Sequence, residues 1–295
     1  MSDGDYTFKT AALKSVVVDS KIGNFDILNV KGKNINELIK ENSFDLPKDI
    51  EKIIYNIDIN NKYCRIIDKN GILIHSNVES VIEDGSYMYN GTIAIDLDGV
   101  YNTPLPKLKN GFAMFSCCNG KSNAKTKDYL VKFESDVPEL INGENMFAGN
   151  IHLVSVKSNM PKLENGNFMF GVGFIGEYYE YYCSSLTYFE GDLSSLKNGN
   201  SMFAGSGLET FKSSLPSLEK GDYMFDRCNL NKESVIRILT SLKNDNKLEE
   251  GKSANIMLSC PSCSSEDSDI NSLLESGNVI TTKNGGKWNI TIATI

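Results

Sequence analysis

Apolar residues recur through the middle of the chain in a unit that fits neither a helical period nor a simple alternation. One unit reads L-x-x-F-x-x-x-L-P-x-L-x-x-G-x-x-M-F, with Met-Tyr in place of Met-Phe in the first copy. The spacings between successive glycines are 26, 32, 23, 33 and 22 residues, so the smallest unit has 22 or 23. A recurring period of this size indicates a repeat protein in which each copy builds one coil. Six copies align on Gly85, Gly111, Gly143, Gly166, Gly199 and Gly221.

One unit of this length cannot bury its apolar face alone, whereas stacked units share a continuous core. We therefore predict a mainly β protein with minor α content, built on a six-unit solenoid over residues 71–230. Six of the nine methionines fall at one position of the unit, where core packing is a better explanation than a cofactor site. Strands of neighbouring coils are predicted to form one parallel sheet, near Ile74, Phe133, Val156, Phe189 and Phe211.

Two further positions of the unit carry backbone signals. The glycine predicts either a positive φ or a close approach of the backbone to a neighbour. Proline fixes its own φ and therefore suits a bend between two edges of a coil. It occupies one position in four of the six units, at Pro106, Pro138, Pro161 and Pro216.

The chain leaves the repeat after Leu230. Asn231 can cap a helix whose Val235, Leu239 and Leu242 share one face, which suits a lid on the open end of the stack. The residues that follow predict a strand at 254–259, a short helix at 270–277 and a hairpin at 278–294 that turns at Asn284-Gly285. We assign residues 231–295 to a C-terminal cap of helix and β-hairpin.

The first 70 residues differ from the repeat, with short alternating segments separated by Gly, Asn and Lys. They hold few large apolar residues, so they are marginal as an independent core. We interpret residues 1–70 as a β-rich anchoring or assembly segment that packs against another subunit, and expect a homo-oligomer, for example a trimer. A small separate β domain is the alternative.

Charge and composition exclude some function classes. The 295 residues carry a net charge of −8 with a pI near 5.0, which weighs against binding to phosphate backbones, so we expect no nucleic-acid partner. The acidic start lacks the apolar run of a signal peptide, and no stretch is long enough to span a membrane, so we expect a chain made in the cytoplasm. Seven cysteines, two of them adjacent, predict mostly thiols.

Two spacings exceed the minimum by about ten residues, which places insertions at 116–128 and 171–185. Insertions into solenoids leave from one face and commonly carry binding. The second insertion is rich in amphipathic rings, which give contact area at low entropic cost. Packing of these rings on the flank of the solenoid is the alternative to partner binding. The candidate binding residues are Phe174, Tyr178, Tyr179, Tyr181 and Tyr182.

The repeat units of the chain resemble those of a known family. The Gly-x-x-Met-Phe units, such as 193–208, are similar to leucine-rich repeats of the BspA type, found in bacterial surface lipoproteins and in virion proteins of tailed bacteriophages. The similarity covers about residues 71–242. It implies a solenoid whose last unit passes into a short helix, as 229–242 does here. Because the chain lacks a lipoprotein signal, the resemblance favours a virion protein over a cell-surface protein.

Catalytic and cofactor motifs are incomplete. His75 and His152 lie in strand-like runs, where a solvent-facing or hydrogen-bonded imidazole is expected. The stretch at 119–123 has the end of a phosphate-binding loop but has Phe115 where that loop needs glycine. The letters from Asp267 start like a calcium loop but lack its glycine and glutamate. Cys260 and Cys263 have half of a zinc site. We assign no catalytic residue, metal or cofactor.

The sequence thus supports two hypotheses. The first is a non-enzymatic bacteriophage virion component, such as a fibre, tail or decoration protein, present in the virion and in the host cytoplasm during assembly. Its partners would be other virion proteins and a glycan or protein of the host surface. The second is a bacterial cytoplasmic or effector-like scaffold for protein interactions.

Overall fold

The structure is a computed structural model of the chain. It gives the backbone alone for strands between residues 14 and 76 and within 173–181. The segments described in full are 82–86, 99–118, 129–171, 182–264 and 267–294. Among the described residues, no helix has the length and apolar character to cross a membrane.

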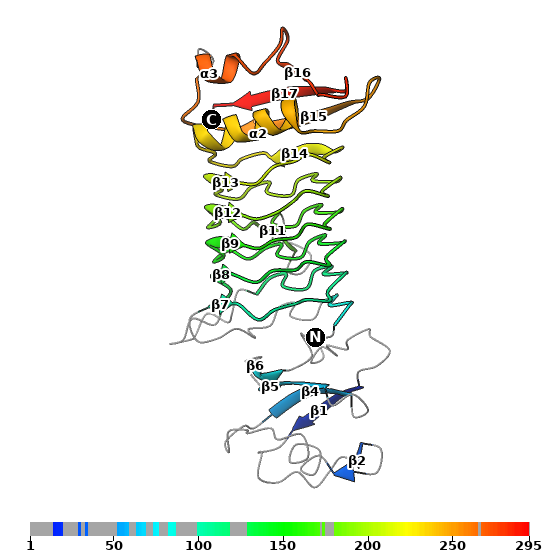
Figure 1. The fold of residues 1–295 in the computed structure, drawn as a ribbon. Coiled ribbons are helices and arrows are strands. Elements are labelled where there is room, and N and C mark those ends of the chain that lie inside the picture. Colours follow the sequence, from blue (N-terminus) through cyan, green and yellow to red (C-terminus); the bar gives the residue numbers. More distant parts are fainter. Residues whose placement is uncertain are drawn as a thin grey trace.

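The middle of the chain is a β-solenoid of stacked coils (Figure 1). One strand from each coil joins a five-stranded parallel sheet, in the order β13-β12-β9-β8-β7. The register pairs the central apolar residues of successive units, for example Phe189 with Val156 and with Phe211. The predicted mainly β solenoid is confirmed. Its strands are β7 (Val100–Tyr101), β8 (Lys132–Phe133), β9 (Ser155–Lys157), β12 (Tyr188–Glu190) and β13 (Thr210–Lys212).

The predicted strand near Ile74 is present, but its predicted place in the parallel sheet is wrong. Ile74 lies in β6 (Leu73–Ser76), which pairs antiparallel with β5 (Tyr63–Asp68), and the parallel sheet instead begins at β7. The first unit contributes to the stack through its glycine segment, where Asp84 bridges in parallel to Asn110. A short apolar run fits a parallel or an antiparallel strand equally well, and the neighbouring strand β5 decided the outcome.

A second parallel ladder runs through the residue before each glycine, from Asp84 by way of Asn110, Asn142, Asn165 and Asn198 to Lys220. Each asparagine donates from Nδ2 to the side-chain oxygen of the preceding coil, for example Asn165 to Asn142 at 3.0 Å. Each also accepts from the backbone N–H two residues on, as in an Asx turn. The Asn-Gly pairs in four of the units are the sequence signal for this ladder, which we did not predict from the sequence.

The Met-Phe pairs form the core, as predicted. Phe147 stacks on Phe115 at 5.4 Å and on Phe170 at 5.1 Å between ring centroids, and the stack continues to Phe203 and Phe225. The phenylalanines of the sheet meet this stack edge to face. Edge-to-face and offset pairs are the favoured geometries for aromatic rings. The methionine and phenylalanine of all five described pairs are fully buried.

The glycines of the repeat do not adopt the left-handed backbone conformation. The positive φ falls two residues later, on Ala113, Asn145, Phe168, Ser201 and Tyr223, and not on the glycines themselves. Close approach is the correct alternative, because a Cβ on Gly166 would lie 3.0 Å from the Met202 sulfur of the next coil. The proline prediction is confirmed: each proline follows the first residue of a turn closed by a hydrogen bond such as Leu163 N–H to the Met160 carbonyl.

Gly143→Val is accordingly expected to destabilise the protein by about 2–4 kcal/mol, by overpacking the site rather than by backbone strain. A Cβ at residue 143 would lie 3.0 Å from the Met169 methyl carbon and 3.2 Å from Leu163 Cδ1. Urea denaturation would measure the change, with Gly143→Ala as the milder variant. Equal stability of wild type and Gly143→Val would show that the core does not need glycine here.

A helix covers the end of the parallel sheet. Asn231 caps α2 (Lys232–Asn244) through a hydrogen bond from Ser234 N–H, as predicted from the sequence. Two buried serines of α2 accept hydrogen bonds from the last coil: Phe211 N–H to Ser234 Oγ at 2.9 Å, and Leu215 N–H to Ser241 Oγ at 2.8 Å. The helix therefore provides hydrogen-bond acceptors for backbone N–H groups at the edge of the last coil, where another strand would otherwise be needed.

The second ladder continues into the cap as a regular sheet. Strand β14 (Gly221–Phe225) pairs in parallel with β15 (Ser253–Ser259), and β15 pairs in parallel with β17 (Lys287–Ala293). The predicted hairpin of β16 (Val279–Thr281) and β17 is confirmed, with Gly285 at a φ of +85°. The predicted short helix lies earlier than expected, because Asp267 caps it and α3 spans only Ser268–Asn271.

The N-terminal strands form a four-stranded antiparallel sheet in the order β1-β4-β5-β6 and a separate pair of β2 with β3. This sheet extends past the predicted boundary at residue 70, because β6 ends at Ser76. The assembly role of residues 1–70 stays a prediction. The bounds not yet given are β1 (Lys14–Asp19), β2 (Asn29–Val30), β3 (Lys33–Asn34) and β4 (Lys52–Asp58).

Candidate binding surface

The second insertion forms a hairpin that leaves the stack between two buried residues, Phe170 and Cys183. Its strands β10 (Gly173–Phe174) and β11 (Glu180–Tyr181) pair antiparallel. Phe174 therefore lies in the outgoing strand and Tyr181 in the returning strand. Tyr178 and Tyr179 fall outside the described residues. Tyr182, at the end of the hairpin, is half-buried.

Tyr182 attaches the hairpin to the next coil. Its ring lies directly against Gly205, where an added Cβ would sit 2.1 Å from Tyr182 Cδ1. Gly205 also has a φ of +72°, so only glycine suits this position on both counts. Of the five candidate tyrosine and phenylalanine residues, Tyr182 is thus the one for which the structure describes packing on the solenoid.

The hairpin is an addition to a complete coil. Elsewhere the same corner is crossed by two residues, as in Phe203-Ala204-Gly205-Ser206. At the base of the hairpin, Cys183 belongs to a column of buried small polar side chains that donate hydrogen bonds to backbone carbonyls at this corner. The Cys183 thiol donates a hydrogen bond to the Phe147 carbonyl at 3.1 Å. Asn150 Nδ2 donates to the same carbonyl at 2.7 Å, and the Cys228 thiol donates to the Phe203 carbonyl.

Burial of this column suppresses thiol reactivity. Desolvation raises the pKa of Cys183 and of Cys228 to about 12. Both groups therefore stay protonated at neutral pH, as their role as hydrogen-bond donors requires. In the first insertion, Ser116 to Cys118 are also buried, while 119–128 lie outside the described residues.

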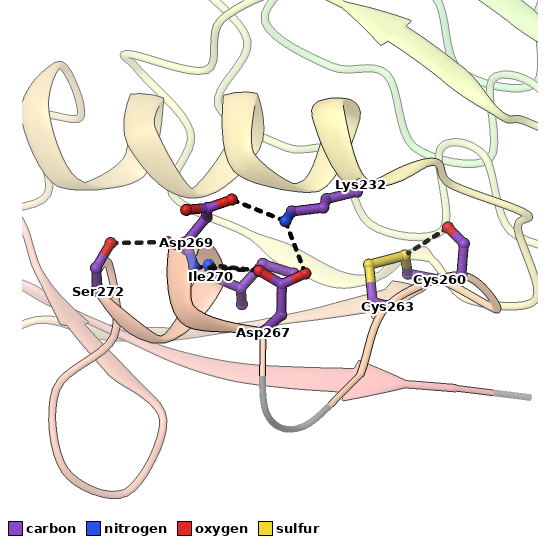
Figure 2. A network of polar contacts seen from close by, with 8 residues as sticks. Lys232, Cys260, Cys263, Asp267, Asp269, Ile270 and Ser272 are labelled. Atoms are coloured by element: carbon purple, nitrogen blue, oxygen red, sulfur yellow. Dashed lines mark hydrogen bonds and ion pairs between the residues drawn. A yellow bond between two sulfur atoms is a disulfide. The ribbon is translucent and has the colours of Figure 1, made fainter.

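The cysteines depart in one place from the expected thiols. Cys260 and Cys263 form a disulfide, whereas Cys117, Cys118, Cys183 and Cys228 are unbridged. Figure 2 shows this disulfide and also Lys232, which bridges Asp267 at 2.9 Å and Asp269 at 2.7 Å and so joins α2 to α3. In the described part of the chain, no group of three His, Cys, Asp or Glu side chains is arranged to hold a metal ion.

Of the two histidines, the structure describes the side chain of His152. His152 stacks on Tyr129 with 3.9 Å between ring centroids, and partial burial lowers the pKa of its imidazole. The imidazole is therefore mostly neutral at pH 7. His75 lies in β6, whose side chains are outside the described residues.

A polar groove of about 900 Å³ lies between α2 and the residues that follow β12 and β13. Its charged groups largely pair with one another or with nearby groups: Glu190 accepts from the Tyr188 hydroxyl, and Arg237 contacts Glu233 at 3.3 Å. The Asp192 carboxylate accepts from Ser194 N–H at 2.8 Å. Of these contacts, only the one between Arg237 and Glu233 joins two residues of the groove lining, and the groove does not bring together a set of catalytic side chains.

The chain was compared with family models, curated proteins and solved structures. No family model matches the chain, and searches of curated proteins and of solved structures found no match.

Proposed function

We propose that this protein is a non-enzymatic structural and binding protein, in which a rigid solenoid presents the hairpin at 171–182 to a partner. The single observation behind this proposal is that the hairpin is added outside a closed coil. Cys183 occupies the buried position at the corner of this coil, and its thiol donates a hydrogen bond to the Phe147 carbonyl. The coil therefore does not need the hairpin for its own core. A tyrosine-rich segment that the core does not require is typical of a contact surface.

The setting we propose is a bacteriophage particle, with the protein as a fibre, tail or decoration component that contacts other virion proteins or the host surface. This setting rests on the resemblance of the Gly-x-x-Met-Phe units to BspA-type repeats of virion proteins. A stack of coils with a buried aromatic column suits a stiff spacer, since each coil contacts only its neighbours and the core is continuous. Homo-oligomerisation through residues 1–70 is part of the same proposal.

The chain itself supplies the variant that tests the hairpin. Replacing residues 172–182 by one glycine gives Phe170-Gly-Gly-Cys183, which restores the two-residue corner seen between Phe203 and Ser206 and keeps Gly171, where a Cβ would lie 3.3 Å from the Phe168 ring. We expect this variant to keep the melting temperature within a few degrees and to lose partner binding. The partner would first be captured from lysed host cells or from particles by the wild-type protein and identified by mass spectrometry.

Capture of the same partner by wild type and by the hairpin replacement would show that the hairpin is not the contact surface. A large fall in melting temperature would instead show that the hairpin serves the fold. Mass spectrometry of purified particles tests the setting separately. Absence of the chain from particles would favour the bacterial scaffold hypothesis.

A further inference from the structure

Two exposed aromatic side chains occupy backbone positions that do not suit them. In the five coils from Gly111 to Gly221, the second residue after the glycine has a φ between +50° and +57°. Asparagine tolerates this left-handed region, as at Asn145, whereas a bulky ring is strained there. Phe168 and Tyr223 nevertheless take this position with 38% and 58% of their surface exposed. Complete burial in the core therefore does not explain why aromatic residues stand at these two positions.

Next to these rings in the chain runs a row of amide and carboxylate groups, at the residue immediately after each of the last four glycines of the repeat. Asn167 Nδ2 donates to Glu144 Oε1 at 3.4 Å, and the Asn200 side-chain oxygen accepts from Asp222 N–H at 3.0 Å. On the cap, Asn255 donates to Asp222 and Asn289 donates to Asn255. The row thus continues from the solenoid onto β14, β15 and β17 of the cap. Figure 1 shows these three strands at the end of the stack.

These groups retain capacity for a ligand. A primary amide has two donors and two acceptor lone pairs, and one donor of Asn289 is used in the bond to Asn255. The row is accessible, since Asn167, Asn200 and Asp222 are half-buried and Asn255 and Asn289 are exposed. Paired donors and acceptors along a rigid line match the adjacent hydroxyl groups of a sugar.

We propose that Phe168, Tyr223 and the adjacent row of amide and carboxylate groups form a binding surface for a neutral oligosaccharide that lies along the solenoid axis. Phe168 and Tyr223 stand two coils apart, which is roughly 10 Å at the spacing of neighbouring β-strands. This separation is about the length of a disaccharide, so the two rings can stack on alternate sugars of one chain. The C–H faces of the sugars contact the rings, and the hydroxyls bond the amides and Asp222.

The charges of this surface select a neutral sugar. Among the first and second residues after the five glycines, Glu144 and Asp222 are acidic and no residue is lysine or arginine. A sialylated or sulfated chain would meet like charge at both carboxylates and no cation at these positions. The inference rests on the proposed binding function and adds the class of ligand and a surface made of the solenoid itself, separate from the tyrosines of the hairpin.

Phe168→Asn and Tyr223→Asn test the surface without loss of the fold. Asparagine is the residue that the chain already uses at this position, at Asn145, so both variants should be at least as stable as wild type. We expect each substitution to lower affinity for neutral oligosaccharides about tenfold, and the pair to abolish measurable binding. Ile141→Ser is the control, because Ile141 is 45% exposed but lies before the glycine and outside the row.

The probes are soluble cello-, chito- and malto-oligosaccharides, and sialylated and sulfated glycans, each measured by calorimetry and on a glycan array. Binding of a neutral chain by wild type and by Ile141→Ser, but not by the double variant, is the expected result. Lack of binding to every neutral chain, binding only to acidic glycans, or full affinity of the double variant would each overturn the proposal.

The hairpin replacement separates this inference from the proposed function. A replacement variant that loses its captured partner but keeps the affinity for neutral oligosaccharides supports both. If the replacement loses its partner and wild type binds no oligosaccharide, the binding function stands and the sugar surface is wrong.

Discussion

Met202→Asp is expected to destabilise the protein by more than about 4 kcal/mol and to break the cooperativity of the solenoid. Met202 is fully buried, and its sulfur lies against Gly166 of the preceding coil. A carboxylate there would be an unpaired charge in an apolar column. Because each coil is stabilised only by its neighbours, the damage would separate the coils on either side. Urea denaturation followed by far-ultraviolet circular dichroism measures it.

The pH dependence of this variant identifies the charge as the cause. Burial disfavours the charged form, so the folded-state pKa of the introduced carboxyl group would be raised above the unfolded value of about 3.9. The destabilisation caused by ionisation is then smallest below the unfolded pKa and grows as the pH rises to the folded pKa. Met202→Leu, which conserves the volume, should cost less than about 1.5 kcal/mol at every pH. A pH-independent loss in Met202→Asp would point to shape instead of charge.

Asn246→Leu is expected to destabilise the cap by about 3–5 kcal/mol. Asn246 is fully buried and joins the last coil to the cap through four side-chain hydrogen bonds. Its Nδ2 donates to the carbonyls of Leu215 at 2.8 Å and Leu218 at 3.0 Å. Its Oδ1 accepts from Leu248 N–H at 3.0 Å and from the Trp288 indole at 3.2 Å. Leucine has a similar size but can neither donate to the two carbonyls nor accept from the two N–H groups.

The chain's one tryptophan makes this prediction easy to follow. Trp288 is fully buried, so its fluorescence reports on the cap, and Asn246→Leu should shift the emission to longer wavelength at a lower urea concentration than wild type. Asn244→Leu is the matched control, since it makes the same change at an exposed residue two positions earlier. Equal midpoints for the two variants would mean that the bonds of Asn246 do not hold the cap.

Only part of the candidate binding surface could be predicted from the sequence. The extra residues between Gly166 and Gly199 located the hairpin, because an insertion breaks the period. The sequence did not show that Tyr182 packs on Gly205, since these residues meet only after the coils stack. Phe168 and Tyr223 also gave no signal, because their strained backbone and their exposure are properties of the folded coil.

For the fold, the sequence alone determined the coil length, the buried Met-Phe column, the prolines at the bends and Asn231 at the start of the cap helix. These features recur or act locally, so they can be read from residues near one another in the chain. The tertiary structure decided what depends on the neighbouring coil or strand. It paired the strand of Ile74 with β5 outside the parallel sheet, and it placed each methionine of the core against the glycine of the preceding coil. It also brought Ser234 and Ser241 to the backbone of the last coil. The partners in these contacts belong to different strands, to different coils, or to a coil and its cap, and only the packed fold brings them together.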